Sequence, residues 1–217
     1  MQALLSYPIS GRTPLYPGTA PVELESTGGG LPASTMVRFD THSGTHLDAP
    51  GHFCPGGPTV QDVLLPLNDL FPAFCVDLPR EGGVGIDEGD MDLPPGSYGA
   101  EALLLRTGMH RFRDKAPLAY SADHPFLMPP FVDWIVRYLP RLKVLGVDCI
   151  SVAHPDHGKE AEVVHRALLC RKPPILIVED MDLSETSLAD GPFRLLLLPV
   201  VRDRVDGSPV VALAMRP

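Results

Sequence analysis

The sequence lacks long apolar runs and has little positive charge. It contains 18 Lys and Arg residues against 27 Asp and Glu residues, a formal net charge of −9 over 217 residues. An acidic chain has no general electrostatic reason to bind nucleic acid or an anionic membrane surface. The longest apolar run, around residues 195–198, is strand length and falls far short of the roughly 20 residues that a membrane span needs. We therefore expect neither nucleic acid nor a membrane among its partners.

We do not expect the first residues to act as an export signal. The first residues have no basic region and are interrupted by Pro8, which makes a poor signal peptide. The cysteines are widely scattered and include no Cys-x-x-Cys pair, so no disulfide framework is indicated. We expect reduced thiols, a cytoplasmic location and, for Cys54, the role of a small buried apolar residue. The cysteines are Cys54, Cys75, Cys149 and Cys170.

Proline and glycine are abundant, with 25 Pro and 20 Gly. This share is close to twice the usual one, and it disfavours long helical bundles and coiled coils. There is no repeat of 20 to 50 residues and no linker between regions of different composition. The length suits one domain, so we predict a single loop-rich β or α/β domain over residues 1–217.

Short apolar runs bounded by Pro, Gly or Asp predict buried strands, whereas two longer segments have helical spacing. The residues 36–42 alternate between apolar and polar, which predicts a half-buried strand leading to a histidine-rich segment. The segments 79–100 and 107–128 have turn chemistry and are expected to be loops. The predicted buried strands are 73–78, 102–107, 143–148, 174–180, 193–201 and 209–215, and the predicted helices are 129–140 and 159–171.

The segment HSGTHLDAPGH contains three histidines and an aspartate: His42, His46, Asp48 and His52. A helix with His42 and His46 one turn apart, as in zinc proteases, is disfavoured because glycine and proline interrupt it. In an extended chain, His42, His46 and Asp48 share one face and can converge on one point. Imidazole and carboxylate ligands suit zinc, manganese or iron(II) with open coordination positions. Histidines of a surface loop, or a closed structural zinc site, are the alternatives.

A second group of polar residues lies far downstream. Glu179 ends an apolar run, and a carboxylate at the tip of a buried strand is costly unless it is paired or binds a metal. His165 lies in a predicted helix, where it is either a residue of the helix face or a ligand. We interpret Asp180 and Asp182 as turn and solvent residues. The group also includes His154 and His157.

HSGTHLDAPGH resembles the His-x-Gly-Thr-His-x-Asp-Ala-Pro-x-His motif of the cyclase-like metal-dependent hydrolases, a family that includes bacterial kynurenine formamidases and isatin hydrolases. The resemblance continues along most of the chain, in the same order as in the family. It includes the opening with an Ile-Ser and an aromatic-Pro-Gly turn, two strands before active-site loops, and a late helix and strand. These segments are 8–21, 103–108, 145–152, 159–169 and 175–183.

The resemblance implies a fold and a set of residue roles. The implied fold is an α/β single domain of the swivelling β/β/α type, with a central mixed, barrel-like β-sheet flanked by helices. The implied cofactors are two divalent metal ions, zinc or manganese. The implied ligands are His42, His46 and Asp48 for the first ion, Asp48 as a bridge, His165 for the second ion, and Glu179 for both. His52 would be the catalytic acid/base, and Tyr16 would lie at the mouth of the substrate pocket, while His154 and His157 receive no role.

The implied activity is that of a binuclear metal-dependent amidohydrolase, in which a metal-bound hydroxide cleaves a small aryl formamide. The kynurenine formamidase reaction converts N-formylkynurenine to kynurenine and formate. An isatin hydrolase-like enzyme for a cyclic amide is the alternative, because Tyr16 stands where those formamidases carry Trp and residues 151–155 depart from their pattern. A metal-binding protein without turnover is the alternative of another class. The family also implies a homodimer or homotetramer that acts on a small aromatic amide.

Overall fold

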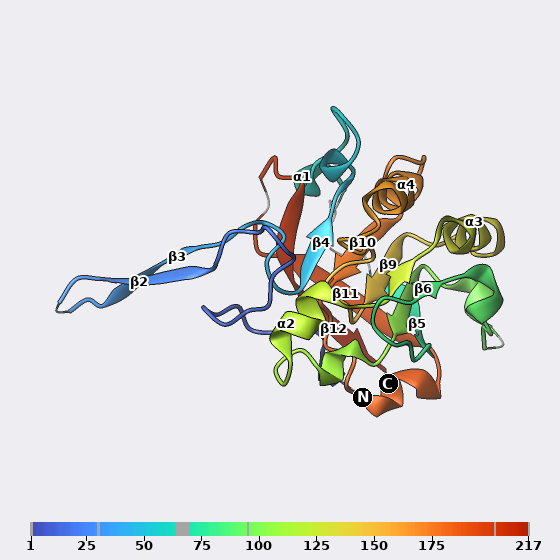
Figure 1. Ribbon diagram of the computed structural model, residues 1–217, viewed down its shortest axis with the longest axis horizontal. Helices are drawn as coiled ribbons and strands as arrows, with labels where there is room; N and C mark the ends of the chain where they lie inside the picture. Colours follow the sequence, from blue (N-terminus) through green and yellow to red (C-terminus); the bar gives the residue numbers. More distant parts are fainter. Residues whose placement is uncertain (1, 30, 64–69, 95, 202, 217) are drawn as a thin grey trace.

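A closed β-sheet forms the centre of the protein (Figure 1). The computed structural model describes residues 2–29, 31–63, 70–94, 96–201 and 203–216. The strand order is β1-β12-β11-β5-β7-β9-β10-β4, and β4 also pairs with β12, so that the sheet closes on itself. The strands are β1 (Gln2–Leu4), β4 (His46–Asp48), β5 (Phe71–Asp77), β7 (Ala102–Arg106), β9 (Val144–Val147), β10 (Leu176–Glu179), β11 (Phe193–Pro199) and β12 (Gly207–Met215).

The closed sheet is mixed. The strands β5, β7, β9 and β10 pair in parallel, and the remaining pairs are antiparallel. Closure depends on β12, whose first residues pair with β4, with Gly207 opposite Asp48 and Pro209 opposite His46. A closed sheet leaves few free strand edges, and it holds β4 between two neighbours. The mixed, barrel-like sheet predicted from the resemblance is confirmed.

The two faces of this sheet belong to separate apolar clusters. Alternate residues of β7, Leu103 and Leu105, belong to a cluster that also contains the buried faces of α3 (Pro129–Tyr138) and α4 (Gly158–Leu169). The residue between them, Leu104, belongs to a second cluster that fills the closed sheet. Space there is tight, because a β-carbon on Gly146 would meet the Leu104 and Met181 side chains. Alternation thus sends one set of side chains to the interior and the other to the helices.

The predicted strands between residues 73 and 215 and the two predicted helices are confirmed. The strand predicted over residues 36–42 is wrong in length and in burial. The strand β3 (Ser34–Arg38) is exposed at every position and pairs with β2 (Glu23–Thr27) in a hairpin that projects from the body (Figure 1). Alternation of apolar and polar residues predicts a strand, but it does not show whether a core lies beneath it.

Short elements occupy the connections, including the segments expected to be loops. They are η1 (Pro50–His52), α1 (Val60–Val63), β6 (Gly85–Ile86), η2 (Glu88–Asp90), η3 (Ser97–Gly99), η4 (Met109–Arg111), α2 (Pro117–Ala122), β8 (Phe126–Leu127) and η5 (Thr186–Asp190). In the described part of the chain, no helix combines the length and the apolar character required to cross a membrane.

Two of the cysteines form a disulfide, contrary to the expectation of reduced thiols. Cys54 and Cys170 are bonded across a sequence separation of 116 residues, while Cys75 and Cys149 are buried and free. The bond joins the loop after η1 to the end of α4, and the spacing of the cysteines in the sequence gives no sign of that contact. A small apolar role for Cys54 is therefore wrong. The cytoplasmic location, which rested on reduced thiols, stays a prediction without that support.

Candidate metal centre

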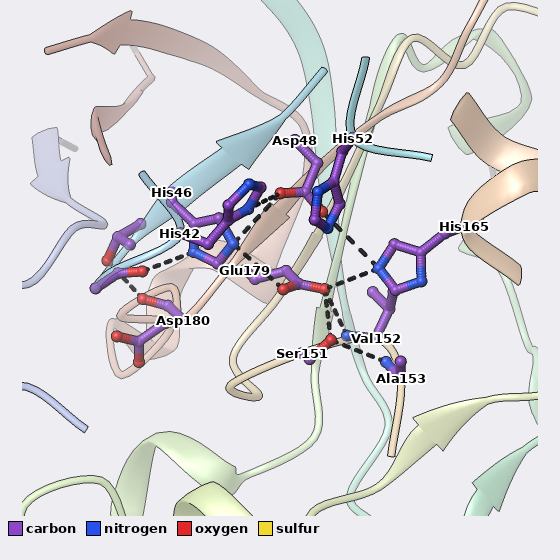
Figure 2. Close-up of polar contacts among 12 residues, drawn as sticks. His42, His46, Asp48, His52, Ser151, Val152, Ala153, His165, Glu179 and Asp180 are labelled. Carbon is purple, nitrogen blue, oxygen red and sulfur yellow. Dashed lines mark hydrogen bonds and ion pairs between the residues drawn. The ribbon is translucent and has the colours of Figure 1, made fainter. Parts of the chain in front are cut away.

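Three elements bring polar side chains to one place under α4. The strands β4 and β10 are antiparallel neighbours, with His46 opposite Glu179 and Asp48 opposite Ile177. Residues of one parity on these strands face α4, so His46, Asp48 and Glu179 meet His165, which lies on the inner face of that helix. All four side chains are buried. The two groups predicted separately along the sequence therefore form one cluster (Figure 2).

Asp48 lies between two groups of potential ligands (Figure 2). Its Oδ1 is 2.9 Å from Nδ1 of His42 and 3.3 Å from Nε2 of His46. Its Oδ2 is 3.9 Å from Nε2 of His165, which in turn lies 3.8 Å from Oε1 of Glu179. In each triad, His42–His46–Asp48 and Asp48–His165–Glu179, the ligand atoms lie within 4.8 Å of one another. One carboxylate thus contributes an oxygen to each of two adjoining candidate sites.

Backbone carbonyls orient two of the imidazole rings. Nδ1 of His46 donates to the Gly44 carbonyl at 2.9 Å, and Nδ1 of His165 donates to the Ala161 carbonyl at 2.8 Å. Each ring then presents Nε2 to the carboxylates, as metal-binding histidines do. Gly44 adopts a φ of +68°, and a β-carbon there would lie 3.2 Å from the Ile9 side chain. The turn between His42 and His46 therefore requires glycine, and it replaces the extended path that was predicted for this segment.

Glu179 is held by the loop that follows β9. Its Oε1 accepts hydrogen bonds from Ser151 Oγ at 2.9 Å and from the Val152 amide at 2.7 Å. Its Oε2 is 3.4 Å from Nε2 of His46. Sequence reasoning did not find the contribution of Ser151, because nothing in a Ser-Val dipeptide marks it as the partner of an acid in the next strand.

The cluster is electrostatically unusual, because two buried carboxylates are balanced only by imidazole rings. Burial and the nearby Asp48 act to raise the pKa of Glu179, but His165 and His46 outweigh them and lower it to about 2. The pKa of Asp48 is also lowered, since hydrogen bonds from His42 and His46 overcome its burial. Across the described ranges, neither carboxylate pairs with Lys or Arg, and Asp48 Oδ2 is buried without a hydrogen-bond partner.

A cavity of about 540 Å³ opens onto this cluster, and the predicted His52 and Tyr16 both line it. The His52 ring stacks on that of His42, with centroids 4.1 Å apart. Burial, together with the neighbouring His42 and His165, lowers the pKa of His52, which favours the neutral form of this ring. Burial likewise raises the pKa of the Tyr16 hydroxyl, followed by the effect of Glu179.

The remaining histidines of the second group lie elsewhere. His154 packs beside His124, with ring centroids 5.3 Å apart, and His157 stacks on Phe126 at 4.4 Å. Neither ring lines the cavity that contains His52 and Tyr16. His165 and Glu179 are therefore the members of that group that join the cluster.

Two carboxylates differ from the sequence-based interpretation. Asp180 was interpreted as a turn or solvent residue, but it is fully buried and forms a two-point ion pair with Arg113 at 2.7 and 2.6 Å. Asp206 was not singled out at all, yet its Oδ2 lies 3.2 Å from both His42 and His52. Both contacts join residues far apart in the sequence, and no local motif predicts them.

Comparison with known proteins places this site in a family. The chain is 30% identical over 213 residues to a kynurenine formamidase of Geobacillus thermodenitrificans, covering 96% of this chain and 94% of that protein. It is also 30% identical over 218 residues to a kynurenine formamidase of Bacillus cytotoxicus, with the same coverage of 96% and 94%.

Solved structures share the fold at lower sequence identity. An isatin hydrolase bound to the product analogue thioisatinate superposes with a TM-score of 0.78 at 19% identity, covering 100% of this chain and 92% of that one. The structure of a potential metal-dependent hydrolase with cyclase activity superposes with a TM-score of 0.74 at 21% identity, covering 100% of this chain and 98% of that one. A family model named Cyclase matches residues 4–154, from before the pocket tyrosine to the loop that holds Glu179. Since this match spans more than half of the chain, the protein belongs to the Cyclase family.

Proposed function

We propose that the protein is a metal-dependent hydrolase that cleaves a C–N bond other than a peptide bond in a small aromatic amide. The observation that carries the proposal is the buried Asp48, whose two oxygens face two different sets of histidine and carboxylate ligands. Its Oδ2 lacks a hydrogen-bond partner, and an unsatisfied buried carboxylate oxygen is costly. A bound cation removes that cost. The formamidases among the relatives support the reaction class.

The residues present fit two divalent ions. His42, His46 and Asp48 would hold the first, and Asp48, His165 and Glu179 the second. This set of imidazole nitrogens and carboxylate oxygens suits zinc best and also accepts manganese. When bound, such ions supply a water of lowered pKa and positive charge to stabilise a carbonyl oxygen that becomes negative.

The chain's own groups supply orientation and proton transfer. Ser151 and the Val152 amide hold Glu179 in place, which keeps its second oxygen directed at His46. The lowered pKa of His52 favours its neutral form, which can accept a proton from the attacking water and return it to the departing nitrogen. Tyr16 and Phe53 line the same cavity and provide aromatic surface for a flat substrate.

For the substrate we propose a kynurenine formamidase-like reaction, the conversion of N-formylkynurenine to kynurenine and formate. The kynurenine formamidases that align along 96% of the chain favour it. A cyclic amide such as isatin is the second candidate, favoured by the superposition on an isatin hydrolase and by Tyr16 in the cavity wall. A cavity of about 540 Å³ accommodates either molecule.

The test combines metal analysis with a substrate panel. Purified protein should bind two zinc or manganese ions per chain and hydrolyse N-formylkynurenine or isatin. His52→Ala should keep the metal and lose at least about 100-fold in kcat, since general acid–base catalysis contributes 10²–10⁴-fold. His157→Ala, which removes a histidine outside the cavity, is the matched control and should be fully active. Wild type that holds metal but hydrolyses no formamide, cyclic amide or lactone would instead be a metal-binding protein without turnover.

We also propose that the chain forms a homodimer or homotetramer through the β2–β3 hairpin. An isolated two-stranded hairpin is marginally stable in water. Leu24 and Val37 lie opposite one another in its register, and both are exposed. A second copy of the chain would bury them. Light scattering should give a mass of two or four chains, and Leu24→Glu should lower it. A monomeric wild type at micromolar concentration would contradict the proposal.

A further inference from the structure

Asp206 lines the cavity beside the candidate metal centre and belongs to neither the His42–His46–Asp48 triad nor the Asp48–His165–Glu179 triad. It immediately precedes β12, and its backbone carbonyl accepts a hydrogen bond from the Ala49 amide at 2.8 Å. Its Oδ2 is 3.2 Å from Nε2 of His42 and 3.2 Å from Nδ1 of His52. Its other oxygen accepts from the Thr41 hydroxyl at 3.4 Å. The carboxylate is therefore fixed from both sides while it contacts two imidazole rings with one oxygen.

This arrangement determines which nitrogen of the His52 ring carries a proton. A carboxylate oxygen only accepts hydrogen bonds, so a nitrogen that bonds to it must be an N–H group. His42 faces a carboxylate oxygen with both of its nitrogens, since Nδ1 also lies 2.9 Å from Oδ1 of Asp48, so the contact with Asp206 selects no tautomer of that ring. For neutral His52, the lone pair lies on Nε2, the nitrogen left to exchange a proton with a molecule in the cavity. The Asp206 carboxylate thus selects one tautomer of His52, with the proton on Nδ1.

The packing around Asp206 allows its carboxylate to contact both the His42 and the His52 ring. The rings of His42 and His52 stack at an interplanar angle of 30°. The residue after Asp206 is Gly207, where a β-carbon would lie 2.4 Å from Cε1 of His42. Only glycine lets the His42 ring lie directly over the chain that carries the carboxylate. The closing register of the sheet, with Gly207 opposite Asp48, then sets the distance between this carboxylate and the metal centre.

We infer that Asp206 is a positioning residue for the reaction, which holds His52 as the Nδ1–H tautomer with Nε2 free to move the proton. The inference rests on the proposed function, in which His52 is the acid/base. The other reading of the geometry is that Asp206, His42 and His52 hold an additional cation, since their ligand atoms also lie within 4.8 Å of one another. That reading requires His42 to bind two ions through its two nitrogens, which a neutral imidazole with one lone pair cannot do.

The first measurement does not depend on catalysis. In metal-free protein labelled with ¹⁵N-histidine, the His52 side chain should show a protonated Nδ1 and an unprotonated Nε2, with the signals assigned from a His52→Gln variant. Asp206→Ala should convert His52 to a mixture of tautomers, and Asp206→Glu should restore the wild-type form. Asp203→Asn is the matched control, because it removes an equal charge from the same exposed loop without a contact to either ring.

The second measurement uses enzyme saturated with metal. We expect Asp206→Ala to lower kcat about 10–100-fold, the usual effect of removing a residue that orients a functional histidine, with KM within about twofold of wild type. Asp206→Glu should recover part of kcat, and Asp203→Asn should match wild type. The bound metal should stay at the wild-type number per chain in all variants.

Two results would overturn the inference. An Asp206→Ala variant with the wild-type His52 tautomer and unchanged kcat would show that the carboxylate positions nothing. A variant that binds one ion fewer than wild type in excess metal would make Asp206 a ligand. If wild type hydrolyses no substrate, the tautomer measurement still decides what Asp206 does to His52, so failure of the proposed function is distinguished from failure of the inference.

Discussion

Glu179 and Asp180 are consecutive buried carboxylates at the end of β10, yet their surroundings are opposite in kind. Glu179 faces His46, His165 and a hydroxyl and amide of the neighbouring loop. Asp180 points away from that cluster (Figure 2), and it binds the Arg113 guanidinium and the Tyr120 hydroxyl. The pKa of Glu179 is lowered to about 2. The pKa of Asp180 is raised, because burial outweighs the hydrogen bonds from Arg113 and Tyr120.

The difference lies in whether the protein supplies a permanent cation. Arginine is always charged, and its planar fork satisfies both oxygens of Asp180, so that pair is complete. Asp48 and Glu179 have only rings that can lose their protons, and one Asp48 oxygen has no partner. These consecutive acids thus differ in role: Asp180 joins two distant segments of the chain, and Glu179 belongs to a candidate centre in which we propose that a cation binds.

The largest expected effect concerns Asp48, whose Oδ2 has no hydrogen-bond partner. Asp48→Asn keeps the shape of the side chain but removes the charge shared by both candidate metal sites. We expect kcat/KM to fall by roughly four orders of magnitude, about 5.5 kcal/mol, because the activation of water depends on the bound cations. Metal content measured after dialysis should fall in parallel. A variant that keeps two ions per chain would show that Asp48 does not bridge them.

Substitutions in the Arg113–Asp180 ion pair should change the stability of the folded protein. Arg113→Met leaves Asp180 buried without its cation, and breaking a buried pair on one side typically costs about 3–5 kcal/mol. Urea unfolding should show this loss, while the folded fraction keeps its metal. The double variant Arg113→Met, Asp180→Asn should recover part of the stability, because no buried charge remains. Equal stability of single and double variants would contradict this account.

Lowering the pH should change the stability contributions of Glu179 and Asp180 in opposite directions. The folded pKa of Glu179 lies below its ordinary value of 4.5, so its contribution is present above pH 4.5 and is lost as the pH falls toward 2. The full span corresponds to about 3 kcal/mol. The raised pKa of Asp180 acts in the opposite direction, because that contribution is lost as the pH rises.

Unfolding of metal-free protein between pH 5 and pH 3 measures this difference. Wild type should lose stability with acid more steeply than Glu179→Gln, in which the group no longer titrates. Parallel curves for the two proteins would mean that Glu179 is not ionised in the folded state.

The smallest effect concerns the residue that orients Glu179. Ser151→Ala removes one of the two hydrogen bonds to Oε1 and leaves the Val152 amide in place. We expect about tenfold weaker metal binding, or about 1.4 kcal/mol, as for other groups that orient metal ligands. Titration with a competing chelator measures it, with the exposed Ser184→Ala as control. Unchanged affinity would show that the amide alone holds the carboxylate.

Local patterns predicted much of this molecule. The spacing of His42, His46 and Asp48 predicted their convergence, although the chain reaches it through a turn at Gly44 and not along one strand. The position of Glu179 at the end of an apolar run predicted a buried acid that needs a partner, and the strands and helices followed from apolar periodicity. The resemblance to the hydrolase family then joined His165 to this group. The single domain over residues 1–217 stays a prediction.

Local sequence patterns could not predict contacts between distant segments of the chain. The Asp180–Arg113 pair, the Cys54–Cys170 bond and the approach of Asp206 to His52 each depend on how the sheet closes. The prediction of a half-buried strand near residue 36 failed for a related reason. Its alternation describes the strand alone, and a projecting hairpin has the same alternation as a strand that covers a core.

Closure of the sheet by β12 also fixes when the candidate metal centre can form during synthesis. The strand β4, which carries His46 and Asp48, lies between β10 and β12, and β12 comprises residues 207–215. A nascent chain therefore holds the HSGTHLDAPGH segment for well over a hundred residues before either neighbour of β4 leaves the ribosome. His42 and His46 are available during that interval, but the candidate centre, which needs Glu179 from β10 and the enclosure of β4 by β12, must await the last strand.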